Sequence, residues 1–327
     1  MDGLLIIDKP VGPTSHDVVA RIRRLLGEPR IGHTGTLDPL ASGVLPLVVG
    51  RATRLARFLS SADKVYEATL HLGIATDSGD RSGTPVGTPY VGPMPDAPTI
   101  DRALDAFRGR FLQRPPDLSA KKIGGKRSYK LTRARARVRD RAGPGSETAL
   151  AETTLQTLAP VAVTTHAISV VSVSDCDVTL TVECSAGFYV RALAADLGER
   201  LGVGAHLSAL RRTRSGDATL STAIELAETD DRAAGYSRVL QALVPLDEML
   251  PGLTAIRLTE HGIRKVRSGR DVMSSDVEGN VPPALMEREV DRKGEDWYRL
   301  MDGAGHLLAL GRPVSGSSLL HPSLVLV

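Results

Sequence analysis

The chain has 327 residues and a mass of 34.8 kDa, and at about 100–200 residues per domain this length predicts more than one domain. The hydrophobic content is 42%, yet no apolar run approaches the roughly 20 residues that span a bilayer, so a membrane protein is excluded. The net charge of +3 is too small to indicate a nucleic-acid partner by itself.

The first residues, MDGLLIIDKP, lack the basic start and long apolar core of a secretory signal, so a cytoplasmic location is expected. LLII at residues 4–7 predicts a short strand. Thr14 or Ser15 can then cap a helix through about Leu26, because apolar residues recur at helical spacing. A polar loop and the apolar run VLPLVVG follow.

KVYEATLHLGI at residues 64–74 predicts a strand whose buried face carries Tyr66 and, at the far end, Ile74. Residues 75–98 are rich in Gly, Pro, Asp and Ser, which indicates a long irregular connection. A helix is predicted from Thr99 to Arg108, with Gly109 as its stop signal.

The alternation in CDVTLTVEC at residues 176–184 predicts another strand. A tight glycine turn and a helix follow, and the start of that helix carries Tyr189 and Arg191. The two cysteines of the chain lie within this strand segment without the second cysteine or histidine pair of a structural zinc site. We therefore expect reduced thiols and no metal.

The acid-rich stretch at 225–235 and Pro251-Gly252 flank the predicted domain boundary. Short strand candidates follow, with a turn offered by Asp302-Gly303. The sequence thus predicts a domain over residues 1–250 and a small, mostly-β module over residues 251–327.

A basic run at residues 121–139 contains nine lysines and arginines and no acid. Such local charge suits a phosphate backbone, because cationic side chains displace condensed counterions. The alternative is a solvated loop that is balanced by acids elsewhere in the fold. The charge leaves both alternatives open for the segment at 113–139, and the composition of residues 139–158 predicts a flexible insertion.

The loop GHTGTLDPLASG at residues 32–43 is too polar for a core segment and holds Asp38 directly before a stiffening proline. It has the composition of a loop that presents a carboxylate. One alternative is an aspartate that caps a structural turn. A phosphate cradle at GHTG is another, but the Walker and GxGxxG spacings are absent. His33 is a further candidate base, although a lone histidine in a glycine loop more often bonds the backbone.

Five segments in order along the chain resemble the motif series of the TruB tRNA pseudouridine synthases. They are IIDKPVGPTSHDVV at 6–19, GHTGTLDPLASGVLPL at 32–47, KVYEATLHLGIATDSGD at 64–80, SAKKIGGKRSY at 119–129, and the stretch from CSAGFYVR to LRR at 184–212. The tail from about residue 252 is similar, more loosely, to a PUA-like domain. The resemblance implies an α+β fold, with flanking helices on a mixed, largely antiparallel central sheet, followed by a PUA-like module that binds RNA.

The resemblance also implies a reaction: isomerisation of the uridine at position 55, in the T-arm loop of tRNA, to pseudouridine. Asp38 matches the catalytic aspartate, Tyr66 the residue that stacks on the target base, and Arg191 the partner of the aspartate. Tyr189 matches the substrate pocket, and His33 matches a histidine that holds the opened RNA loop. Lys9 is a plausible active-site neighbour.

The reaction changes neither oxidation state nor composition, so no cofactor, metal or nucleotide is expected. The carboxylate could attack the sugar or the base, or help remove a sugar proton, and the sequence does not choose among these routes.

The expected partner is tRNA, bound by a monomer. A non-catalytic tRNA-binding protein is the alternative. The candidate contacts to the RNA backbone are Lys126, Arg127, Lys130, Arg133, Arg135 and Arg137.

Overall fold

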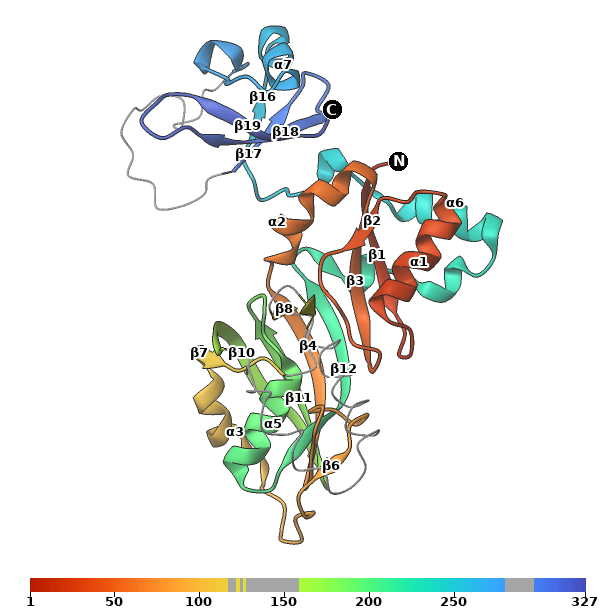
Figure 1. The fold of residues 1–327 in the computed structure, drawn as a ribbon, viewed down its shortest axis with the longest axis vertical. Helices are drawn as coiled ribbons and strands as arrows, with labels where there is room; N and C mark the ends of the chain where they lie inside the picture. The colour runs from red at the N-terminus through yellow and green to blue at the C-terminus, as the bar shows by residue number, and fades with distance from the viewer. Residues whose placement is uncertain (117–121, 124–125, 128–158, 280–296) are drawn as a thin grey trace, which may run out of the picture.

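The computed structural model describes residues 1–116, 122–123, 126–127, 159–279 and 297–327, with residues 122–123 and 126–127 described by their backbone alone. Figure 1 shows an elongated molecule in which a large sheet with its helices carries a smaller sheet at one end. The prediction of a flexible insertion at 139–158 lies outside the described residues.

The large sheet is mixed. Its order is β14 (Ile224–Glu225), β1 (Gly3–Lys9), β3 (Ala41–Val49), β12 (Ala205–Ser215), β4 (Lys64–Leu72), β11 (Asp177–Cys184), β10 (Val161–Ser174) and β7 (Gly109–Gln113), with β2 (Ile31–His33), β13 (Ala218–Thr219) and β15 (Val244–Pro245) paired beside this path. Among the strand pairs described in this sheet, only β1 with β14 and β3 with β12 are parallel. The predicted α+β class with a largely antiparallel sheet is confirmed.

Helices flank this sheet: α1 (Ser15–Leu26), α2 (Ala56–Ser60), α3 (Ala97–Leu104), α5 (Val190–Leu201) and α6 (Arg232–Ala242). The predicted first helix is confirmed, because Thr14 and Asp17 form a capping box at its start. Gly27 ends it in the left-handed conformation, with φ at 65°. The strand, glycine turn and helix predicted over residues 176–201 are confirmed as β11 and α5.

Three local predictions need correction. The helix predicted from Thr99 begins at Ala97, because Asp96 caps it, and its last turn is the separate 3₁₀ helix Asp105–Phe107. Ile74 lies beyond the end of β4, since Gly73 turns the chain with φ at 101°. The acid-rich stretch at 225–235 leads into α6, which its composition did not indicate.

The small sheet consists of β16 (Ala255–Arg257), β17 (Tyr298–Met301), β18 (Leu307–Pro313) and β19 (Leu320–Val325). Asp302-Gly303 does lie in the turn between β17 and β18, although the residue with positive φ is Gly305. The sequence EHGIRKVR between β16 and β17 forms the helix α7 (Glu260–Arg267). A small, mostly-β unit is therefore present, while the boundary at residue 251 and its PUA-like character stay predictions.

A shared apolar cluster joins the two sheets. It combines Val48 and Leu55 from the large unit with Leu310 and Leu324 from the small one. Arg51 donates from Nη1 to the carbonyl of Leu326 at 2.8 Å. The joint is therefore a packed, hydrogen-bonded interface.

Trp297 belongs to the same joint. Its ring packs edge-on against Phe58, with ring centroids 4.9 Å apart. The guanidinium of Arg57 lies 4.7 Å from each of these two ring centroids.

Within the part of the chain that the structure describes, no helix is both long and apolar enough to cross a membrane.

Candidate active site

The loop that holds Asp38 runs from the end of β2 to the start of β3 and is fastened at the residue before the acid. Ser15 Oγ donates to the Leu37 carbonyl at 3.0 Å and accepts from the Leu37 N–H at 2.8 Å. The Gly12 N–H donates to the Pro39 carbonyl at 2.8 Å. The Asp38 side chain itself is 37% exposed. The loop is held by its backbone while the carboxylate remains accessible.

The same bonds bear on the phosphate-cradle alternative. A phosphate cradle needs free backbone N–H groups. In this loop the N–H of Leu37 donates to Ser15, and the N–H of Thr34 donates to the Pro46 carbonyl at 3.1 Å. These donors are already used within the protein, which does not favour a phosphate site.

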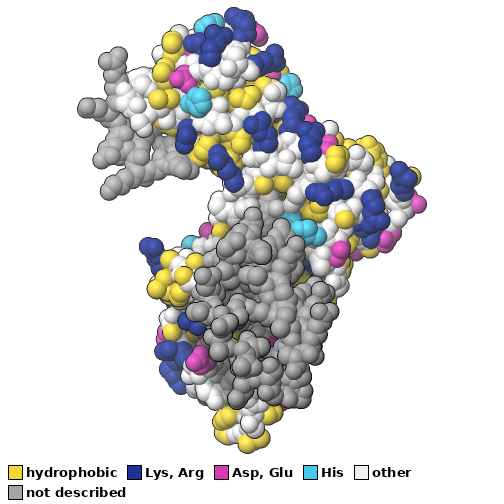
Figure 2. Space-filling view, viewed as in Figure 1, with side chains coloured by type: hydrophobic (Ala, Val, Ile, Leu, Met, Phe, Trp, Pro, Cys, Tyr) yellow, Lys and Arg dark blue, Asp and Glu magenta, His cyan; other side chains and the backbone are white. Residues whose placement is uncertain are grey.

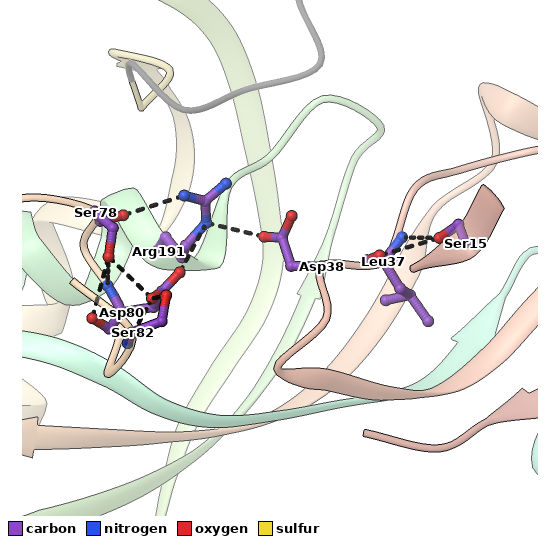
Figure 3. A network of polar contacts seen from close by, with 7 residues as sticks. All are labelled: Ser15, Leu37, Asp38, Ser78, Asp80, Ser82 and Arg191. Atoms are coloured by element: carbon purple, nitrogen blue, oxygen red, sulfur yellow. Dashed lines mark hydrogen bonds and ion pairs between the residues drawn. The ribbon is translucent and has the colours of Figure 1, made fainter. Parts of the chain in front are cut away.

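Arg191, in the first turn of α5, reaches the Asp38 carboxylate across the sheet. Its Nε lies 2.9 Å from Asp38 Oδ2, and its side chain is only 8% exposed. Its Nη1 donates to the Ser78 carbonyl at 3.1 Å. Figure 3 shows the guanidinium between the loop of Asp38 and the segment of Ser78. The two residues that the resemblance pairs are thus in contact, although 153 positions separate them (191 − 38).

Asp80, to which no role was assigned from the sequence, also lies beside the Arg191 guanidinium. Its Oδ2 lies 3.9 Å from Arg191 Nε, and its side chain is 7% exposed. Its Oδ1 accepts from Ser78 Oγ at 2.9 Å and from the Ser82 N–H at 2.9 Å (Figure 3). The sequence signal was present, because Asp80 ends the third motif, but it lay in a segment predicted to be irregular.

Tyr66 lies on β4 directly opposite Arg212 of β12. Burial raises the pKa of Tyr66; the nearby charge of Arg212 opposes this, and the charge of Asp38 adds to it. Tyr66 is 9% exposed and belongs to the apolar core of the large unit.

Arg212 is a buried cation that sequence reasoning missed. It is 1% exposed and donates from Nε to the Val44 carbonyl at 2.7 Å and from Nη2 to the Gly35 carbonyl at 3.2 Å. A Cβ on Gly43, whose φ is 101°, would lie 2.2 Å from the Arg212 carbonyl oxygen. Glycine at this position lets β3 and β12 approach, and Arg212 then fastens the loop of Asp38.

Lys9 is fully buried at the end of β1. Its Nζ donates to the carbonyls of Pro10 and Pro13, each at 2.9 Å. Burial lowers the pKa of Lys9 to about 8; the charge of Asp38 opposes this shift, and the charge of Arg212 adds to it. Lys9 is therefore an electrostatic neighbour of Asp38, and its ammonium group holds the turn that follows β1.

Tyr189 and His33 occupy different surroundings. Tyr189 is the N-cap of α5, and its backbone N–H and carbonyl both bond to the side-chain amide of Gln113. The His33 ring packs edge-on against His16 of α1, with centroids 5.5 Å apart. Tyr189 is thus two residues from the ion pair, whereas the contact described for His33 is with α1. The roles assigned to both stay predictions.

The basic candidates lie mostly outside the described residues. Lys126 and Arg127 form β9 (Lys126–Arg127), which pairs with β8 (Lys122–Ile123). Lys130, Arg133, Arg135 and Arg137 are not among the described residues. Figure 2 shows further lysine and arginine side chains over the small unit and the joint on the face displayed. Exposed arginines of the small unit include Arg264 and Arg267 on α7.

Two family profiles match consecutive parts of the chain. The profile described as TruB family pseudouridylate synthase (N terminal domain) matches residues 23–190. The profile described as tRNA pseudouridylate synthase B C-terminal domain matches residues 191–251. Together they cover Asp38, Tyr66 and Arg191.

Relatives and solved structures agree with these profiles. The chain is 39% identical to tRNA pseudouridine synthase B of Solibacter usitatus over 326 residues, which is 100% of both chains. It is 40% identical to the same enzyme of Geobacter sulfurreducens over 280 residues, 85% of each chain. A solved H/ACA RNP bound to a substrate RNA containing 2′-deoxyuridine has a chain that is 25% identical, with a TM-score of 0.66 over 99% of this chain and 85% of that one.

Proposed function

Because the chain belongs to the TruB family, and is therefore a tRNA pseudouridine synthase, we propose that it isomerises the uridine at position 55 in the T-arm loop, with Asp38 as the catalytic carboxylate. The observation that carries this proposal is the ion pair between Asp38 and Arg191. It leaves Asp38 accessible while the guanidinium is buried, as expected for an acid that meets a substrate from outside.

The chemistry fits a lone carboxylate. The N1–C1′ bond of uridine breaks and a C5–C1′ bond forms, the base then loses its C5 proton, and N1 regains one. Atoms and electrons balance without an oxidant or a nucleotide. Arg191 orients the carboxylate, and Asp38 has a free edge for the sugar or the base. Attack on the sugar, attack on the base and a glycal route all remain compatible with this geometry.

A uridine in a folded loop must leave its stack to reach Asp38, which costs a few kcal/mol. Stacking on an aromatic side chain recovers about 1–3 kcal/mol per base. We assign this role to Tyr66, because it lies opposite Arg212, the residue that donates to the Gly35 carbonyl in the loop of Asp38. Tyr189, at the start of the helix that carries Arg191, lines the same pocket in this proposal.

The rest of the RNA needs a basic surface. We assign this role to the segment at 113–139, in particular Lys126, Arg127, Lys130, Arg133, Arg135 and Arg137. We assign a second contact to the small unit, treated as a PUA-like domain from residue 251. Its helix α7 carries exposed Arg264 and Arg267, which suit phosphate contacts. The protein would act as a monomer in the cytoplasm.

The test uses the full chain and a T-arm stem-loop RNA, without added metal or nucleotide. Pseudouridine is mapped after treatment with wild type, with Asp38→Asn and with Asp101→Asn. Asp101 is a matched control because it is an exposed acid that also pairs with an arginine, Arg108. Wild type and Asp101→Asn should modify position 55. Asp38→Asn should not, while its RNA affinity stays within about tenfold, or 1.4 kcal/mol.

The outcomes separate the alternatives. An active Asp38→Asn variant would remove Asp38 from the chemistry. If the wild type binds the stem-loop without modifying it but modifies another site in tRNA, then the T-arm assignment is wrong. If it binds and modifies no RNA, the non-catalytic binding protein is the better description.

A further inference from the structure

Gln113 is a buried amide at the end of an edge strand. Gln113 is the last residue of β7 and is only 1% exposed. Its Nε2 donates to the Tyr189 carbonyl at 3.0 Å, and its Oε1 accepts from the Tyr189 N–H at 2.8 Å. One side chain therefore bonds both polar groups of one backbone residue that lies 76 positions away.

The residue held in this way begins the helix that carries Arg191. Tyr189 is the N-cap of α5, and its carbonyl also accepts the first intrahelical bond, from the Leu193 N–H at 3.1 Å. The two bonds from Gln113 therefore act on the N-cap residue of α5 through its backbone. Arg191 follows two residues later and lies 2.9 Å from Asp38.

The bonding pattern requires one donor and one acceptor at the end of the side chain. Gln113 supplies one donor and one acceptor to Tyr189, whereas an ionised carboxylate is only an acceptor and a methionine of similar length supplies neither. A protonated glutamic acid again has a donor. The backbone of Tyr189 is thus matched to glutamine, and to neutral glutamic acid, among side chains of this length.

We propose that Gln113 is a positioning residue for the isomerisation: by fixing the Tyr189 backbone it sets the start of α5 and the placement of Arg191 against Asp38. The inference rests on the proposed roles of Asp38 and Arg191. It is independent of which tRNA uridine is the substrate. Gln113 acts through Tyr189 and Arg191, and it is not assigned a contact with RNA.

The experiment compares wild type with Gln113→Met, Gln113→Glu and Leu112→Ala, all as full chains. Leu112 is the neighbouring residue on β7 and is 70% exposed, so its variant controls for changes in the strand. The substrate is an unmodified tRNA transcript, and total pseudouridine is measured in single turnovers at saturating enzyme. The fitted rate constant is kept apart from the amplitude, which reports the fraction of competent enzyme.

We expect Gln113→Met to lower the rate constant about 100-fold at every pH, since a misplacement of about 1 Å has such an effect. Its amplitude and tRNA affinity should stay near those of wild type. Gln113→Glu should be slow at about pH 8 and recover, relative to wild type, as the pH falls toward about 5, because burial raises the pKa of a carboxyl and protonation restores the donor. Leu112→Ala should match wild type.

Three results would overturn the inference. One is an unchanged rate constant in both Gln113 variants. Another is a loss of amplitude or thermal stability at an unchanged rate constant, which would make Gln113 merely structural. The third is a pH profile of Gln113→Glu that is parallel to that of Gln113→Met. Failure of the proposed function looks different, because then wild type would be inactive or Asp38→Asn would be active.

Discussion

Arg191 Nε lies 2.9 Å from one oxygen of Asp38 and 3.9 Å from one oxygen of Asp80, so one buried guanidinium is shared by an accessible acid and a buried one. The two acids differ in their other bonds. Asp80 accepts hydrogen bonds from Ser78 and Ser82, which fix it in place. Asp38 keeps an exposed edge. In the proposed function, this asymmetry suits Asp38 for substrate contact and Asp80 for the support of Arg191.

Asp80→Asn tests that division. The change removes the charge facing Arg191 and converts one acceptor into a donor, so the guanidinium should shift from its place at Asp38. We expect the single-turnover rate to fall about 10- to 100-fold, with unchanged tRNA affinity. Asp177→Asn, an exposed acid that pairs with His71, is the control. Equal rates for the two variants would show that Asp80 has no part in placing Arg191.

Ser15→Ala tests the anchoring of the catalytic loop. The variant leaves the N–H and the carbonyl of Leu37 without their side-chain partner, which should reduce the free energy of unfolding by about 1–3 kcal/mol. It should also slow catalysis, because Asp38 is the next residue. Urea unfolding and single-turnover rates provide the two readouts. Ser60→Ala is the control, since Ser60 is exposed and its hydroxyl donates to the Ala56 carbonyl within α2. Wild-type rates in Ser15→Ala would mean that the loop keeps its shape without this anchor.

The pKa of Lys9 predicts a pH dependence of stability. Burial lowers it to about 8 from the ordinary 10.5, so between these values the unfolded chain binds more protons at Lys9 than the folded chain does. The free energy of unfolding should therefore gain a component that rises from pH 8 to 10.5 and is at its minimum below pH 8, where both states are charged.

Lys9→Met should lack this component. Urea unfolding of both proteins at several values between about pH 7 and about pH 10 measures the difference between their curves. The difference should change across this range in favour of wild type as the pH rises. Parallel curves would contradict the assigned pKa.

Leu310→Ala tests the joint between the two units. Leu310 is fully buried in the shared cluster, so its truncation should reduce the free energy of unfolding by about 2–5 kcal/mol. Trp297 is the single tryptophan of the chain and belongs to the same cluster, so its fluorescence reports the loss. Leu240→Ala, at a residue that is 41% exposed, is the control. Identical unfolding midpoints for the two variants would argue against a packed joint.

Local patterns were sufficient for the elements with strong periodicity. Alternation placed Tyr66 on the buried face of β4, and the capping residue Thr14 placed the start of α1. They failed where charge hides an apolar stripe, as in α7, whose buried residues are Ile263 and Val266 between cationic neighbours. Strand ends set by a glycine turn, as at Gly73, were also misplaced.

The residues of the site also differ in whether the sequence could predict them. Asp38 and Arg191 lie in motifs that carry a recognisable resemblance, so the sequence could pair them. Gln113 and Arg212 could not be found from local pattern, because their partners lie 76 and 168 positions away in the chain. Only the sheet brings such residues together. The RNA contacts assigned to the basic segment remain a prediction, since most of that segment lies outside the described residues.

Ser15 and Gln113 both bond to main-chain atoms, of Leu37 and Tyr189, rather than to the functional side chains beside them. Main-chain atoms are the same for every amino acid that can occupy those two positions. Side chains that serve the RNA can therefore be exchanged in the course of evolution without loosening the scaffold, and the scaffold can be tuned without altering what the RNA meets.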